Sequence, residues 1–257
     1  MWTAAAVLAG CSRPPAVPAG AQAADPQPEA DYAHPPELRA VQPAQGGVVL
    51  SGVADPDALI RLASPDGTVV GAAANHKGEW TLPIPASAVL RLFSLSQDVG
   101  GRPLRAVGYL AVLPAPSVGA DILRPGSAAV PVRPARAAAI TALDFDAAGV
   151  AVVSGLAPHN SVVRVSVDGA YVGNDHADSG GRFAVPLPQV LRAGPHTLQA
   201  QTPSGGAVVA LDATPARATI TSIYTAARSG RAWRIDWVTP AGGVQTTLLF
   251  DPPGAPS

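Results

Sequence analysis

Residues 46–85, GGVVLSGVADPDALIRLASPDGTVVGAAANHKGEWTLPIP, and residues 149–188, GVAVVSGLAPHNSVVRVSVDGAYVGNDHADSGGRFAVPLP, are two copies of one pattern. Ser154 in the second copy lies 103 residues after its counterpart Ser51 in the first. Self-similarity at a fixed spacing indicates one structural unit used twice. We therefore expect two domains of the same fold.

Inside each copy, apolar and polar residues alternate with a period of two, which is typical of strands with one buried face. Turn signals such as Asp66-Gly67 and Asp168-Gly169 separate the alternating runs. About seven short strands with frequent turns predict an all-β chain with two tandem immunoglobulin-like β-sandwiches. The residues expected to face inward include Ile60, Leu62, Trp80, Leu82 and Ile84 in the first copy, and Val163, Val165, Val167 and Phe183 in the second.

Composition fits this prediction and excludes one class of partner. The 257 residues include 28 prolines and 26 glycines, with 47% hydrophobic and only 14% charged residues. Such a chain can bury cores and favours short strands with many turns over long helices. Its net charge of −1 provides no basic field to attract phosphates, so we expect no nucleic-acid partner.

Two stretches of the first copy carry a family resemblance. VVLSGVADPDALIRL at 48–62 and GEWTLPIP at 78–85 resemble the bacterial Ig-like modules of surface and periplasmic proteins. The copy departs from that family's usual pattern at Asp55, where proline is commoner, and at His76-Lys77 before the glycine. These departures fall in loops. The resemblance implies the sandwich fold and is nearly silent about function.

Cys11 is the only cysteine, so it has no partner for an internal disulfide and no second thiol for a zinc site. Leu8-Ala9-Gly10-Cys11 resembles the lipobox of bacterial lipoproteins. The resemblance implies that segment 1–11 is a signal peptide with its lipobox, that Cys11 becomes the lipidated mature N-terminus, and that the protein is anchored to the outer membrane. The alternative is an alanine-rich terminus with an incidental cysteine.

The remaining chain divides by composition. Proline-rich stretches at 12–36 and 115–136 predict a disordered tether and a spacer, because proline removes a backbone donor and opposes both helix and sheet. The predicted domains are a signal segment at 1–11, a tether at 12–36, a first module at 37–114, a linker at 115–136, a second module at 137–215 and a C-terminal β extension at 216–257.

The C-terminal extension departs from the repeat and predicts a meander of three strands, at 218–225, 230–239 and 243–250. Trp233, Ile235 and Trp237 fall on one face of its second strand. A meander of this size needs a partner to bury such a face. We expect the face to pack on a module or on the linker. Left exposed, Trp233 and Trp237 would instead form a binding surface for sugar, peptide or another subunit.

No catalytic motif is present in the sequence, so we expect no enzyme, no cofactor and no metal site. Asp175 and Asp178 could supply oxygen ligands, but their spacing lacks the alternation and the glutamate of a calcium loop. We interpret them as solvated turn residues. His159 and His196 lie in loops and lack an obvious catalytic partner.

These observations predict a non-enzymatic lipoprotein of the cell envelope. Its membrane contact would be the lipid on Cys11, and its modules would act as a structural or protein-interaction scaffold. The alternative is a polysaccharide- or peptidoglycan-associated binding protein that uses an exposed Trp233/Trp237 face. A third hypothesis, an unrecognised hydrolase, would need a pocket that joins a carboxylate, a histidine and a hydroxyl.

Overall fold

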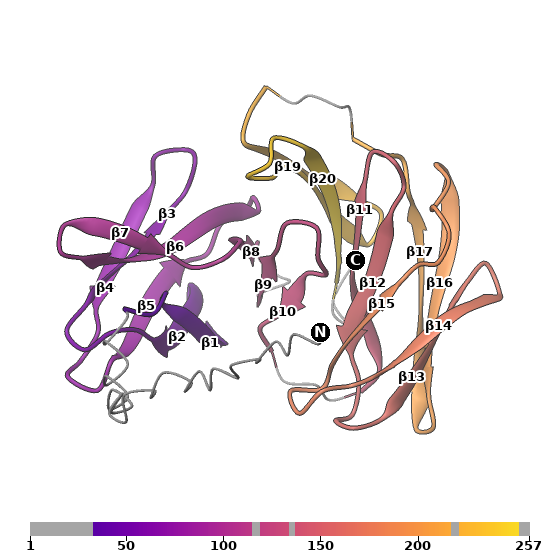
Figure 1. Ribbon diagram of the computed structural model, residues 1–257, viewed down its shortest axis with the longest axis horizontal. Helices are drawn as coiled ribbons and strands as arrows, with labels where there is room; N and C mark the ends of the chain where they lie inside the picture. The colour runs from indigo at the N-terminus through magenta and orange to yellow at the C-terminus, as the bar shows by residue number, and fades with distance from the viewer. Residues whose placement is uncertain (1–32, 115–118, 134–136, 217–220, 252–257) are drawn as a thin grey trace, which may run out of the picture. The chain divides into compact units, whose positions relative to one another are not determined.

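The computed structural model describes residues 33–114, 119–133, 137–216 and 221–251 (Figure 1). Residues 33–257 belong to one compact unit. The secondary structure within the described ranges is entirely β, with twenty strands and no helix. None of the described residues therefore forms a helix long and apolar enough to span a membrane.

The first sandwich contains seven strands in two antiparallel sheets (Figure 1). One sheet has the order β1-β2-β5, and the other contains β4-β3-β6 with β7 also paired to β6. The strands are β1 (Glu37–Ala44), β2 (Gly47–Val53), β3 (Leu59–Ala63), β4 (Val69–Ala73), β5 (Glu79–Pro85), β6 (Arg91–Val99) and β7 (Arg102–Arg105). Ile60, Leu62 and Trp80 are buried between the sheets, as their alternation predicts.

The second sandwich repeats this arrangement strand for strand. Its sheets have the orders β11-β12-β15 and β14-β13-β16-β17. The strands are β11 (Ala139–Asp146), β12 (Ala151–Leu156), β13 (Val162–Val167), β14 (Ala170–His176), β15 (Arg182–Pro186), β16 (Pro195–Thr202) and β17 (Gly205–Asp212). Val163, Val165 and Phe183 are buried in its core. The predicted fold class is confirmed: the chain is all-β and contains two tandem Ig/FnIII-like sandwiches.

The two copies also share an irregularity. The pairing of β1 with β2 shifts register between Leu38 and Ala40, and the pairing of β11 with β12 shifts between Ile140 and Ala142. A bulge of this kind bends a strand and re-aims its side chains. Because it recurs at the equivalent position, it belongs to the repeated unit itself.

Three further strands extend the larger sheet of the first sandwich. They are β8 (Tyr109–Leu113), β9 (Gly119–Leu123) and β10 (Val130–Pro131), and they continue from β6 in the order β10-β9-β8-β6. The prediction of a spacer at 115–136 is therefore wrong for β9 and β10. Leu123 is completely buried, because pairing with β8 turns a stretch without clear periodicity into an ordered strand.

The C-terminal extension forms the predicted three strands and adds them to the second sandwich. They are β18 (Tyr224–Ser229), β19 (Ala232–Val238) and β20 (Val244–Phe250). Because β20 pairs with β11, the sheet becomes β15-β12-β11-β20-β19-β18. The first strand begins later than predicted, since its register is set by pairing with β19, from Tyr224 opposite Trp237 to Ser229 opposite Ala232.

Candidate functional site

Cys11, the predicted lipidation site, lies outside the described residues, as do the signal segment and nearly all of the predicted tether. The lipid anchor therefore stays a prediction. The other predicted site residues, Trp233 and Trp237, lie on β19.

Trp233 and Trp237 do lie on one face of β19, but that face is packed. Trp237 is completely buried and meets the Tyr109 ring edge-on, with ring centroids 5.8 Å apart. Its indole Nε1 donates a hydrogen bond to Thr247 Oγ1 at 3.1 Å. Trp233 is partly buried, with the Arg228 guanidinium 5.4 Å from its ring centroid. The proposal of an adhesive surface is thus wrong for Trp237, because β8 supplies the apolar partner that its side chain needs.

A shared hydrophobic cluster explains this burial. It draws on β6 of the first sandwich with β8 and β9 of its extension, and on β11 of the second sandwich with β19 and β20 of its extension. Both extensions thus bury their apolar faces in one core. Its buried members are Leu90, Leu92, Ala111, Leu113, Leu123, Ala129, Ala142, Ile235, Trp237 and Leu249.

A buried polar network lies beside this cluster and centres on Asp144 of β11. One carboxylate oxygen accepts the backbone N–H of Ala129 at 2.7 Å. The other accepts the Thr247 hydroxyl at 2.6 Å and the Gln245 amide at 3.2 Å. Gln245 in turn accepts the backbone N–H of Gly126 at 2.9 Å. These bonds tie the β9–β10 connection to β11 and β20, and buried polar groups satisfied in this way specify one arrangement.

Both buried carboxyl groups near this connection have raised pKa values. Burial raises the pKa of Asp144 to about 6, although its hydrogen bonds act in the opposite direction. Burial likewise raises the pKa of Asp121 on β9 to about 6, which the charge of Arg133 offsets only in part. The nearest guanidinium nitrogen of Arg133 is 3.9 Å from Asp121 Oδ2, too far for a hydrogen bond. The free-energy cost of removing the Asp121 carboxylate from water is therefore only weakly offset by Arg133.

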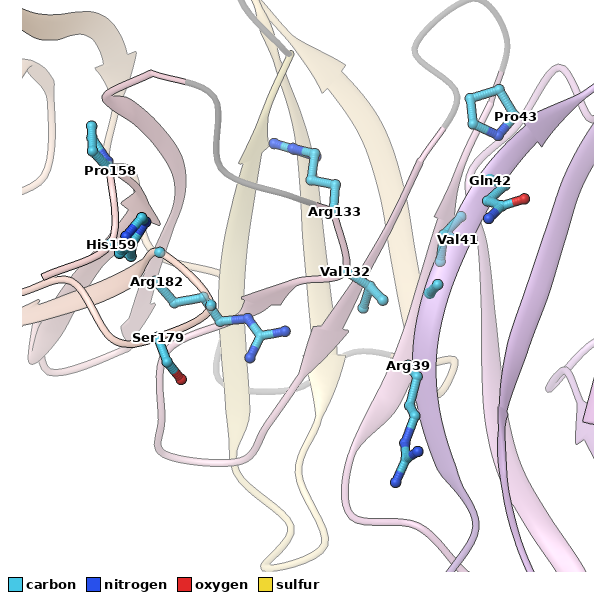
Figure 2. A pocket seen from close by; sticks show the side chains of 13 residues that line it. Arg39, Val41, Gln42, Pro43, Val132, Arg133, Pro158, His159, Ser179 and Arg182 are labelled. Carbon is cyan, nitrogen blue, oxygen red and sulfur yellow. The ribbon is translucent and has the colours of Figure 1, made fainter. Parts of the chain in front are cut away.

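A cleft of about 790 Å³ borders the smaller sheet of the first sandwich, beside β1 (Figure 2). Figure 2 shows Arg39, Val41 and Gln42 along one strand, with Arg133 and Arg182 on other segments around the same space. Four segments of the chain thus meet here. The lining comprises residues 39–43 of β1, 132–133 after β10, 158–159 after β12 and 179–182 at the start of β15.

The cleft lining is basic. It contains Arg39, Arg133, Arg182 and His159 and no aspartate or glutamate, although the whole chain carries a net charge of −1. Arg39 is paired with Glu37 at 3.6 Å, but both side chains are more than half exposed, so water and salt weaken the pair. Arg133 lies 3.9 Å from the buried Asp121, so Arg39 and Arg182 are the arginines best able to attract an anionic group. Sequence reasoning missed them because they are scattered along the chain, and only the fold gathers them.

The likeness of the chain to known proteins is distant. No family model and no curated protein matches the chain. Solved structures similar to it include the following two. The first, "Biofilm associated protein - BSP domain", is 18% identical with a TM-score of 0.27, over 72% of this chain and 30% of that one. The second, "Central Fibronectin-III array of RIM-binding protein", is 13% identical with a TM-score of 0.26, over 87% of this chain and 88% of that one.

The chain thus spans about 30% of the length of the biofilm-associated structure. At such low TM-scores, neither likeness supports an argument about function. What stands is the architecture itself: tandem Ig/FnIII-like sandwiches with two sheet extensions packed on each other.

The two carboxylates considered as oxygen ligands bind backbone N–H groups instead. Asp178 precedes a turn as predicted, but the interpretation of Asp175 as a turn residue is wrong, because it lies on β14, opposite Val163 of β13. Asp175 accepts backbone hydrogen bonds from His176 and Ala184, both at 2.8 Å, and Asp178 accepts them from Gly180 and Arg182, also at 2.8 Å. Asp178 thus holds the turn before β15 in shape, and Asp175 ties β14 to β15. Across the described ranges, no three or more histidine, cysteine, aspartate or glutamate side chains are grouped so as to hold a metal ion.

His196 has a carboxylate partner that sequence reasoning missed. Its Nδ1 lies 2.7 Å from Asp168 Oδ2, and its Nε2 lies 2.8 Å from the carbonyl oxygen of Arg192. Burial acts to lower the pKa of His196, but these two hydrogen bonds together with the charges of Asp168 and Asp212 outweigh it, and the pKa is raised. Asp168 and Gly169 have φ values of 50° and 81°, which confirms the predicted two-residue hairpin. The pair thus braces a hairpin turn against β16.

Proposed function

We propose that this protein is a non-enzymatic lipoprotein of the cell envelope whose two sandwiches act as a structural and protein-interaction scaffold. The observation that carries the proposal is the shared hydrophobic cluster of the two sheet extensions. A flexible spacer would let each module act separately. Here residues such as Leu123 and Trp237 are buried together, which favours a preformed double module that presents fixed surfaces to a partner.

The anchor in this proposal is Cys11 with its lipobox-like sequence. Metabolic labelling with a fatty acid should tag the wild-type protein and should fail in Cys11→Ala. The experiment uses the native gene with its upstream sequence. Absence of label from the wild type would remove the lipoprotein part of the proposal and leave the scaffold part standing.

The scaffold role is tested by crosslinking in intact cells followed by mass spectrometry. The expected result is recovery of specific envelope proteins from the wild type and their loss from Cys11→Ala, which would no longer be held at the membrane. Recovery of cytoplasmic proteins only, in both variants, would contradict an envelope scaffold. Polysaccharide binding through a Trp233/Trp237 face is not proposed, because Trp237 is buried.

A further inference from the structure

The two sandwiches differ at one sheet edge. In the second, β20 covers the outer edge of β11 by pairing along Ala142–Asp146. In the first, the bulge places Ala40–Ala44 of β1 at the equivalent positions. β1 ends the sheet β1-β2-β5, and among the described residues no strand pairs with its other side. The edge strand is thus covered by β20 in the second sandwich, and the equivalent edge of β1 in the first sandwich is open.

An open edge of this length can add a strand. The unpaired side of a strand presents backbone N–H and C=O groups, which an extended segment can satisfy by antiparallel pairing. Proteins usually protect such edges with charged side chains, above all lysine, with proline, with a bulge or with a cover. β1 has no lysine, and its Pro43, which has no backbone N–H to donate, lies at the end of the strand. Residues 39–43 line the open cleft. The edge is therefore accessible from the cleft.

The basic residues around the open edge of β1 determine which kind of extended segment can bind there. Arg39 is on β1 itself, and Arg133 and Arg182 line the same cleft together with His159. No carboxylate belongs to the lining. Complementary charges speed encounter and suppress wrong partners more than they add raw affinity. An incoming strand with aspartate or glutamate is thus favoured, and a basic one is rejected.

We propose that the outer edge of β1 accepts an extended, acidic segment of a partner polypeptide as an added antiparallel strand, in the way that β11 accepts β20. This inference deepens the proposed scaffold role and rests on it, because it names the chemistry of the partner. The recognising groups are the backbone of Ala40–Ala44 and the side chains of Arg39, Arg133 and Arg182.

The first test uses the full-length protein and three synthetic nine-residue peptides, followed by fluorescence anisotropy. One peptide alternates valine and threonine with aspartate near both ends. The second carries lysine in place of aspartate, and the third is the acidic peptide with alternate backbone amides methylated. Only the acidic, unmethylated peptide should bind well, and methylation should weaken binding about tenfold, since it removes the strand's donors. Equal binding of the methylated peptide would overturn strand addition.

The second test locates the site. Arg39→Glu combined with Arg182→Glu should weaken the acidic peptide about tenfold, because two attractions become repulsions. Arg102→Glu, at an exposed position of the same sandwich outside the cleft, is the matched control and should change binding less than about twofold. Thermal unfolding of each variant confirms that it folds. In hydrogen exchange, the bound peptide should protect β1 and leave β11 unchanged.

Two further results would contradict the proposal. If polyglucuronate binds the cleft more tightly than the peptide, an anionic polysaccharide is the ligand and the proposal is wrong. If the acidic peptide fails to bind the full chain, the edge is closed to partners and the proposal is equally wrong. Because these measurements use purified protein, they are independent of the crosslinking that tests the envelope role. Failure of the strand-addition proposal can therefore be distinguished from failure of the proposed envelope role.

Discussion

Gly155 lies opposite Phe183 in the pairing of β12 with β15, and the aromatic ring fills the space that a side chain at Gly155 would need. An added Cβ would lie 2.6 Å from the ring and 2.1 Å from the carbonyl oxygen of Ala139. Gly52 and Trp80 stand in the same relationship in the first sandwich. The repeat therefore keeps a glycine so that a large aromatic side chain can lie across the strand.

Gly155→Ala should destabilise the second sandwich by about 1–3 kcal/mol, since the contact with a backbone carbonyl leaves the new methyl group no room. Gly243→Ala is the control, because its Cβ would meet nothing closer than 3.6 Å, and its cost should stay within about 0.5 kcal/mol. Urea unfolding followed by circular dichroism measures both. Equal stability of the two variants would show that the aromatic ring can move aside.

The aromatic anchors themselves differ between the copies in a way that can be tested. Trp80 is buried, yet among the described residues its indole Nε1 has no hydrogen-bond partner, and the second copy uses phenylalanine at this place. Trp80→Phe should therefore cost no more than about 1 kcal/mol, because the smaller ring also removes an unsatisfied donor. Trp80→Ala and Phe183→Ala should each cost about 3–5 kcal/mol. Losses below about 1 kcal/mol for both alanine variants would argue against a core role.

The fold could be predicted because its determinants are local. Alternation at Ile60–Leu62 and Val163–Val165, together with Asp-Gly turns, specifies strands whose inward faces need no knowledge of distant partners. Each copy also repeats the same information. The prediction of two sandwiches therefore depended on patterns only a few residues long.

The shared hydrophobic cluster, which forms the joint between the two sandwiches, could not be predicted in the same way. Leu123 and Trp237 contribute to one cluster, but they are far apart in sequence, and the stretch around Leu123 has no clear periodicity. The same holds for Arg39 and Arg182 in the basic cleft. Their proximity is a property of the sheet pairings β8–β9 and β11–β20, which sequence patterns do not specify.

The joint can be tested by comparing the two tryptophans of β19. Trp237→Ala should cost about 3–5 kcal/mol, because it opens a cavity in the shared cluster and leaves Thr247 without its indole donor. Trp233→Ala, on the same strand but only partly buried, should cost less than about 1.5 kcal/mol. Urea unfolding by circular dichroism reports both values. A larger loss for Trp233 than for Trp237 would mean that the cluster does not hold the joint.

The buried carboxyl group of Asp121 should make the protein more stable in mild acid. Burial raises its pKa to about 6 in the folded state, against about 3.9 in the unfolded chain. Its contribution to stability is therefore full below pH about 3.9 and is lost as the pH rises through about 6. Two pKa units correspond to about 2–3 kcal/mol, and Asp144 should behave in the same direction.

Asp121→Asn should remove this part of the pH dependence and stabilise the protein at pH 7, because the amide needs no compensating charge and Asp121 Oδ1 has no hydrogen-bond partner among the described residues. The measurement is the free energy of unfolding in urea at pH 5 and pH 7. Asp57→Asn, at an exposed turn position, controls for loss of a negative charge. If the wild type is no more stable at pH 5 than at pH 7, or if Asp121→Asn is the less stable protein at pH 7, the Arg133 pair compensates the carboxylate more fully than its 3.9 Å separation indicates.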